Sequence, residues 1–177
     1  MTFGIVRLYR ASDPQKAADV TNNHLDKHNR KNAYIGKSIT RPNVFILASR
    51  YESLSQKLEE EEENRNANLV GNLGGGEFLN ITLIKPVNST NPGKALNSNS
   101  YLSVFGGENS DVRKTVELSK KINEIDGQSL LDKGIATIQT VAITGIPMNT
   151  TFIWHAIETP ETAEKVLVDG ITEFHSE

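Results

Sequence analysis

The stretch Tyr101–Gly127 constrains the fold most, because it combines the signals of a strand, a turn and a helix in direct succession. Tyr101–Phe105 is rich in aromatic and β-branched residues and predicts a short buried strand. A turn is expected at Gly106-Gly107. Asn109 or Ser110 is then expected to cap a helix, since a short side-chain oxygen accepts a hydrogen bond from an unpaired backbone N–H.

The helix after this cap is predicted from its hydrophobic period. Val112, Val116, Ile122 and Ile125 recur at spacings close to the helical repeat, so they are expected to face the core. Gly127 is placed to end the helix in a left-handed cap.

A glycine turn that leads into a helix N-terminus also has the elements of an anion site, because free N–H groups and the helix dipole point at one spot. The candidate residues are Gly106, Gly107, Asn109 and Ser110. The stretch lacks the lysine of a P-loop and the glycine spacing of a dinucleotide fingerprint, and Glu108 and Asp111 would repel a phosphate. A purely structural turn is therefore the preferred interpretation, with the anion site as the alternative.

Length and composition favour one domain over residues 1–177, with no strongly basic surface for nucleic acid. The chain has a net charge of −3, no cysteine, 37% hydrophobic residues and 6% aromatic residues. Disulfides and thiolate metal sites are thus excluded, and no apolar run approaches a membrane span. We expect synthesis in the cytoplasm without a signal peptide. We also expect a homo-oligomer, in which neighbouring subunits add to the apolar surface that so lean a core can bury.

His24 and His28 lie one helical turn apart on a predicted helix that starts at Ser12-Asp13-Pro14, a cap followed by Pro in the first turn. Two imidazoles in this spacing can share a metal, as in zincin helices. The catalytic glutamate of that motif and an obvious third ligand are both missing. We therefore expect no metal site here and no cofactor elsewhere.

Two polar segments have open interpretations. The acidic run Glu59–Glu63 ends a predicted helix in which Leu54 and Leu58 are expected to face inward. Such a run is either a solvated, self-repelling face or a contact for a basic partner. Pro86–Ser100 is expected to be a long polar loop, either an arm that contacts a neighbouring subunit or plain disorder.

The remaining patterns predict a class of fold. Phe3–Tyr9 alternates as a strand, with Phe3, Ile5, Arg7 and Tyr9 on one face. Further strands and helices follow in mixed order, and we see no internal sequence repeat. The prediction is a single α+β domain with a mixed or mainly antiparallel sheet and about four helices packed on it.

No motif in the sequence fixes a chemistry. We find no nucleophile elbow, zincin motif, Walker lysine or calcium loop. The lean core and long polar connectors favour a non-enzymatic structural protein that assembles into a symmetric oligomer, such as a virus or phage particle component. The alternatives are a small-ligand or anion-binding module at the Gly106-Gly107 turn and an enzyme without a recognisable motif.

Overall fold

The computed structural model describes residues 2–38, 41, 43–90, 101–144 and 149–169. Within them, five helices accompany a large, open antiparallel sheet of seven strands, so the predicted α+β class is confirmed. The chain divides into two compact units, unit 1 (Met1–Ile84) and unit 2 (Lys85–Glu177). The expectation of a single domain stays a prediction. No helix in the described residues is long and apolar enough to cross a membrane.

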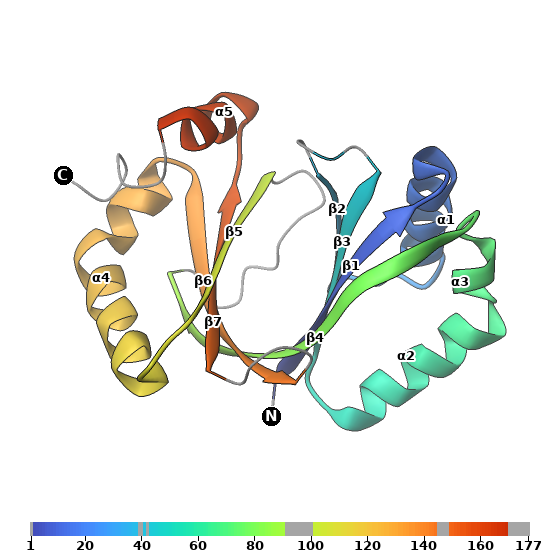
Figure 1. The fold of residues 1–177 in the computed structure, drawn as a ribbon, viewed down its shortest axis with the longest axis horizontal. Helices are drawn as coiled ribbons and strands as arrows, with labels where there is room; N and C mark the ends of the chain where they lie inside the picture. Colours follow the sequence, from blue (N-terminus) through green and yellow to red (C-terminus); the bar gives the residue numbers. More distant parts are fainter. Residues whose placement is uncertain (1, 39–40, 42, 91–100, 145–148, 170–177) are drawn as a thin grey trace. The chain divides into compact units, whose positions relative to one another are not determined.

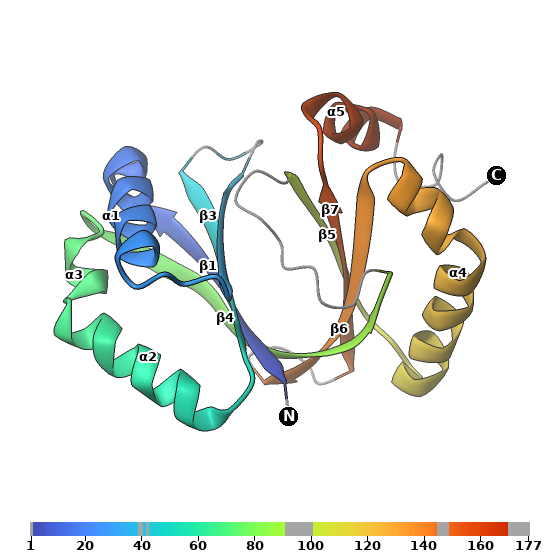
Figure 2. The same ribbon diagram turned by 180° about the vertical axis from the view of Figure 1, so that it is seen from behind.

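Unit 1 packs three helices on one face of a four-stranded antiparallel sheet (Figures 1 and 2). Its elements are β1 (Phe3–Ala11), α1 (Pro14–Lys27), β2 (Ala33–Lys37), β3 (Val44–Tyr51), α2 (Leu54–Asn66), α3 (Leu69–Asn72) and the first part of β4 (Gly76–Ser89). The strand order is β2-β3-β1-β4. This connectivity and order are those of the ferredoxin-like βαββαβ unit.

Unit 2 repeats the same scheme. After the end of β4 it contains β5 (Tyr101–Glu108), α4 (Val112–Asp132), β6 (Ile135–Thr144), β7 (Thr150–Ile157) and α5 (Pro160–Asp169). β7 pairs antiparallel with both β5 and β6, just as β3 pairs with both β1 and β2 in unit 1. The two units therefore share a structural repeat, although no sequence repeat is visible.

Short polar side chains cap the N-termini of four helices, and at α5 Thr159 Oγ1 accepts from the backbone N–H of Thr162. Asp13, Ser53 and Asp111 cap α1, α2 and α4, and each accepts a hydrogen bond from the backbone N–H three residues further on. The expectation of a cap at Asn109 or Ser110 is therefore wrong by one or two residues.

The predicted inward face of α4 is also wrong. The helix does not stop at Gly127 but continues to Asp132, and the chain turns at Gly134 with φ 76°. Gly127 is buried. A Cβ at this position would lie 3.2 Å from Thr90 Cγ2, so the glycine permits close packing of α4 against Thr90. Leu130 is fully buried, whereas Ile125 is 79% exposed.

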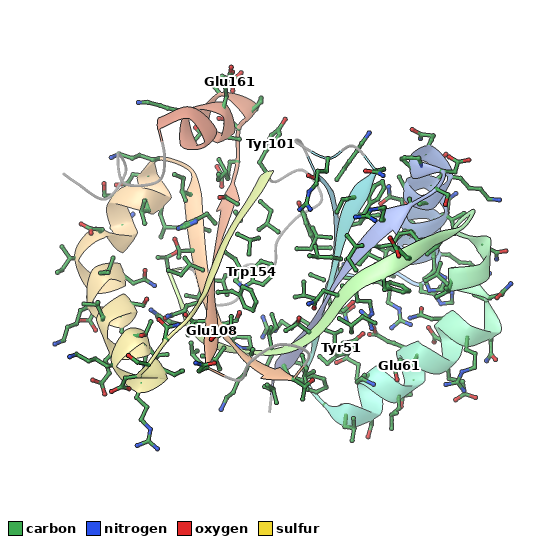
Figure 3. The ribbon with its side chains drawn as sticks, viewed as in Figure 1. Tyr51, Glu61, Tyr101, Glu108, Trp154 and Glu161 are labelled. Carbon is green, nitrogen blue, oxygen red and sulfur yellow. The ribbon has the colours of Figure 1, made fainter. Side chains whose placement is uncertain are left out.

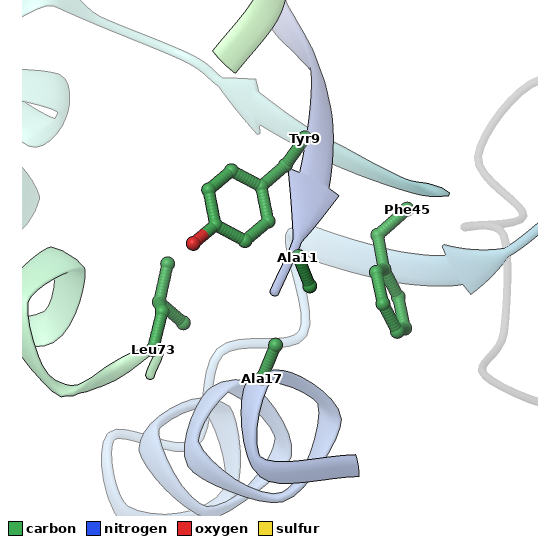
Figure 4. Close-up of a cluster of buried hydrophobic side chains, with 5 residues drawn as sticks. All are labelled: Tyr9, Ala11, Ala17, Phe45 and Leu73. Atoms are coloured by element: carbon green, nitrogen blue, oxygen red, sulfur yellow. The ribbon is translucent and has the colours of Figure 1, made fainter. Parts of the chain in front are cut away.

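Each unit has its own apolar cluster. In unit 1, Tyr9 and Phe45 from the sheet pack with Ala17 of α1 and Leu73, and the two alanines Ala11 and Ala17 leave room for the helix (Figure 4). In unit 2 the cluster consists of Leu130, Ile135, Ile157 and Ala163, with Tyr101 packed against it. In each unit a small group of large apolar side chains, together with one or two alanines, joins helix to sheet.

The first part of the segment Pro86–Ser100, expected to be a polar loop, is a strand instead. Pro86–Ser89 form the end of β4, and Thr90 continues beside β6 through hydrogen bonds with Thr137. Residues 91–100 lie outside the described residues, so the proposed role of this segment as an arm stays a prediction.

Candidate functional site

A cavity of about 540 Å³ lies within unit 1, and residues of α1, α2, α3 and the sheet line it. This volume is in the range of small-molecule binding sites. Figure 3 labels two of the lining residues, Tyr51 at the end of β3 and Glu61 on α2. The cavity is a candidate ligand site because it combines an apolar wall with several convergent polar groups.

The apolar wall comes largely from the sheet and the segment around α3. Leu47 of β3, Leu69, Leu73 and Phe78 line it. Arg7 of β1 interrupts this surface and also lines the cavity, half-buried. The predicted alternation of β1 therefore places Arg7 correctly on the face shared with Ile5 and Tyr9.

The polar wall comes from α2, and the expected orientation of this helix is wrong. Leu54 and Leu58, predicted to face inward, are 62% and 54% exposed, whereas Glu60 is only 6% exposed. Glu60, Asn64 and Arg65 line the cavity. The helix turns its charged face inward because buried partners from the rest of unit 1 pair with it.

Arg30 is the main partner of α2. Its guanidinium lies 2.6 Å from Glu60 Oε1 and also pairs with Glu63. Asn32 Nδ2 donates to the same Glu60 oxygen at 2.9 Å, and Gln56 Nε2 does so at 3.3 Å. The acidic run is thus not simply a solvated face, since Glu60 and Glu63 bind an arginine of the same chain.

The two histidines predicted as weak metal candidates lie together at the edge of this network. Their ring centroids are 4.5 Å apart. His24 Nε2 is 2.7 Å from Asn64 Oδ1, and His28 Nδ1 is 3.2 Å from Glu63 Oε2. No cluster of three or more metal-ligating side chains occurs in the described residues. The expected absence of a metal site at His24 and His28 stays a prediction.

The surroundings of His24 lower the pKa of its imidazole. Burial lowers its pKa below the usual 6.5 more than its hydrogen bond to Asn64 raises it, and the neighbouring Arg30 guanidinium lowers the pKa further against a smaller opposing effect of Glu63. His24 is therefore a neutral imidazole at pH 7, within the cavity wall.

The residues of the predicted anion site lie elsewhere, in unit 2, and do not form the expected turn. Gly106 and Gly107 are inside β5, where a Cβ on Gly106 would lie 2.6 Å from Phe152 Cδ1. Asn109 Nδ2 donates to Gly107 O and to Thr151 Oγ1. Ser110 is followed by the actual cap, Asp111. The anion site at these residues stays a prediction.

Known proteins match this chain in fold but not in sequence. No family model and no curated protein matches the sequence. Solved structures do match the fold. A proposed monooxygenase from Fusobacterium nucleatum aligns with a TM-score of 0.70 and 8% identity over 99% of this chain and 84% of its own.

Two further matches have related descriptions. An anthrone oxidase-like protein aligns with a TM-score of 0.62 and 9% identity over 94% of this chain and 77% of its own. The haem-degrading enzyme LmHde from Listeria monocytogenes aligns with a TM-score of 0.53 and 7% identity over 97% of this chain and 86% of its own. Because these neighbours are enzymes or enzyme-like, the prediction of a non-enzymatic assembly protein or virus particle component is wrong.

Sequence reasoning missed this cavity because its polar groups come from separate segments. Neither Arg30 nor Asn64 belongs to a recognisable motif in the sequence. One signal was present: the alternation of β1 places a charged residue, Arg7, on an otherwise apolar face.

Proposed function

We propose that this protein is an enzyme that binds a small organic molecule in the cavity of unit 1 and oxidises it. The observation that carries the proposal is the cavity of about 540 Å³, with its mixed lining and a neutral histidine in its wall. The descriptions of the fold neighbours support the oxidative chemistry, because they include an anthrone oxidase-like protein and proposed monooxygenases.

His24 is the proton acceptor in this proposal. Since Asn64 Oδ1 can only accept a hydrogen bond, Nε2 of His24 is the nitrogen that carries the proton. Nδ1 then has the free lone pair, and the lowered pKa keeps it unprotonated at pH 7. A neutral imidazole held in one tautomer is suited to remove a proton from a bound substrate, as general-base catalysis requires.

One neighbour is a haem-degrading enzyme, so haem is a candidate ligand for the cavity of unit 1. A haem needs an axial ligand for its iron and a largely apolar surface against its macrocycle. Nε2 of His24 is held by Asn64 at 2.7 Å, and the helical wall beside it carries the Arg30–Glu60 ion pair, which an apolar macrocycle would leave further desolvated. These residues do not fit haem, and we assign it no role in this cavity.

Anthrone and a panel of small phenols provide the test. Oxidation of anthrone by one O₂ gives anthraquinone and one water, so oxygen uptake and quinone absorbance are measured together. We expect uptake with at least one compound. His24→Gln should lower kcat about 10²- to 10⁴-fold if His24 removes the proton.

His28→Gln is the matched control, because His28 is the C-cap residue of the same helix and does not line the cavity. It should retain most of the parental rate. Folded protein that consumes no oxygen with any compound, or a His24→Gln variant as active as the parent, would overturn the proposal.

Self-association is part of the same proposal. The lean core suggested a homo-oligomer. Light scattering across the micromolar range tests this expectation, and a monomer at every concentration would contradict it.

A further inference from the structure

Arg7 occupies an unusual position for a charged residue. It lies in the middle of β1, opposite Leu47 of β3 and Ile81 of β4. Ile5 and Tyr9 lie on the same face of β1, and both are buried. The guanidinium therefore projects from an apolar part of the sheet into the cavity.

Within the part of the chain that the structure describes, Arg7 has no hydrogen-bond or ion-pair partner. The two carboxylates that line the cavity are already paired with other cations. Glu60 binds Arg30 at 2.6 Å, and Glu61 binds Lys57 at 2.7 Å. The cavity wall thus carries a positive charge that the protein itself does not neutralise.

An arginine stays protonated at any physiological pH, so it cannot relieve this situation by losing its charge. A half-buried charge without a partner is costly, and a ligand that pairs with it recovers that cost on binding. The planar guanidinium also presents parallel N–H groups that match the two oxygens of a carboxylate or phosphate. Leu47, Leu73 and Phe78 offer an apolar surface for the remainder of such a ligand.

We infer that the cavity selects organic anions, with Arg7 binding the carboxylate or phosphate group of the ligand. This inference rests on the proposed function, since it places the ligand in the same cavity. It goes further by naming the class of substrate, which is an apolar small molecule with one oxyanion group. Arg7 then orients the substrate relative to His24 in the opposite wall.

Matched ligand pairs test the inference by isothermal titration calorimetry. Benzoate and 1-naphthoate are compared with benzamide and 1-naphthamide, which have nearly the same shape without the charge. 1-Naphthyl phosphate distinguishes a preference for phosphate from one for carboxylate. We expect at least one anion to bind about 10- to 100-fold more tightly than its neutral partner, as hydrogen bonds to a charged group imply.

Arg7→Gln should abolish this advantage and leave the affinity for the amides unchanged. Arg10→Gln is the matched control, because Arg10 lies on the same strand, is exposed and already pairs with Glu77 at 2.7 Å. It should retain the advantage. Arg7→Lys keeps the charge without the planar fork and should lose several-fold in affinity for the anions.

Stability gives a second, independent measurement. If Arg7 is kept for a ligand, Arg7→Gln should raise the urea midpoint of the unliganded protein, since it removes an unpaired charge. If Arg7 instead stabilised the fold, Arg7→Gln would lower the urea midpoint. A fall in the midpoint therefore overturns the inference even where no ligand binding is measured.

The outcomes separate the two proposals. Equal binding of anions and amides overturns the role of Arg7 and leaves the cavity as a small-molecule site. An anion preference that survives in Arg7→Gln does the same. Binding of neither class overturns the ligand site and both proposals with it.

Discussion

Replacing Glu60 by alanine should destabilise the protein far more than replacing its neighbour Glu61. The Arg30 and Glu60 side chains are 13% and 8% exposed, so the pair is shielded from water. Asn32 and Gln56 also donate to the Glu60 carboxylate. Its removal leaves three donors without that acceptor, one of them charged.

The structure sets the size of the effect. Removing one partner of a buried ion pair costs about 3–5 kcal/mol. Glu63 remains beside Arg30 in the variant, and its side chain is 48% exposed, so we expect the lower end, about 3 kcal/mol. Glu61 pairs with Lys57 at i and i+4 on α2, and Glu61→Ala should cost about 0.3–0.5 kcal/mol.

Urea unfolding at pH 7, followed by far-UV circular dichroism, measures both variants. A slope of about 1–3 kcal/mol per molar urea converts 3 kcal/mol into a midpoint shift of at least about 1 M. Fluorescence of Trp154, the only tryptophan, reports on unit 2 in the same samples.

The double variant Arg30→Met and Glu60→Met tests the physical reason. It removes both charges together, so it should be more stable than Glu60→Ala. The reasoning is refuted if Glu60→Ala loses no more stability than Glu61→Ala, or if the double variant is the least stable of all.

Two further predictions concern burial and pH. Leu130→Ala should lower the free energy of unfolding by about 2–5 kcal/mol, because Leu130 is fully buried. Leu118 is 59% exposed on the same helix, so Leu118→Ala should stay within about 0.5 kcal/mol of the parent. Equal losses of the two variants in urea unfolding would contradict this packing of α4. The second prediction follows from the lowered pKa of His24. Between pH 6.5 and the lower pKa of the folded state, the unfolded chain binds a proton at His24 that the folded chain does not bind. The stability of the protein should therefore fall as the pH drops below 6.5. Unfolding from pH 8 to pH 5 should show a shallower decline for His24→Gln, and an unchanged decline would count against the assignment.

The sequence by itself determined the types of element and their class. Period-two alternation in β1 and helical caps such as Asp13 act over a few residues, so the α+β class with a mainly antiparallel sheet followed from local signals. The same alternation put Arg7 on one face with Ile5 and Tyr9, and the tertiary structure showed that this face lines the cavity.

Tertiary structure decided which face of each helix is buried. The leucines of α2 and the isoleucines of α4 looked like inward stripes, yet Leu58 and Ile125 are exposed. A helical period shows that a face exists but not what packs against it. For α2 the deciding partners were Arg30 and Asn32, which bind Glu60 from a distant segment.

The candidate site depended on tertiary structure for the same reason. His24 meets Asn64 across 40 residues of sequence, and Arg30 meets Glu63 across 33. The cavity arises where these segments face Arg7 in the sheet. Local sequence encodes strands, caps and helix lengths, but the long-range pairing of charges determined which polar side chains entered the interior and so created the site.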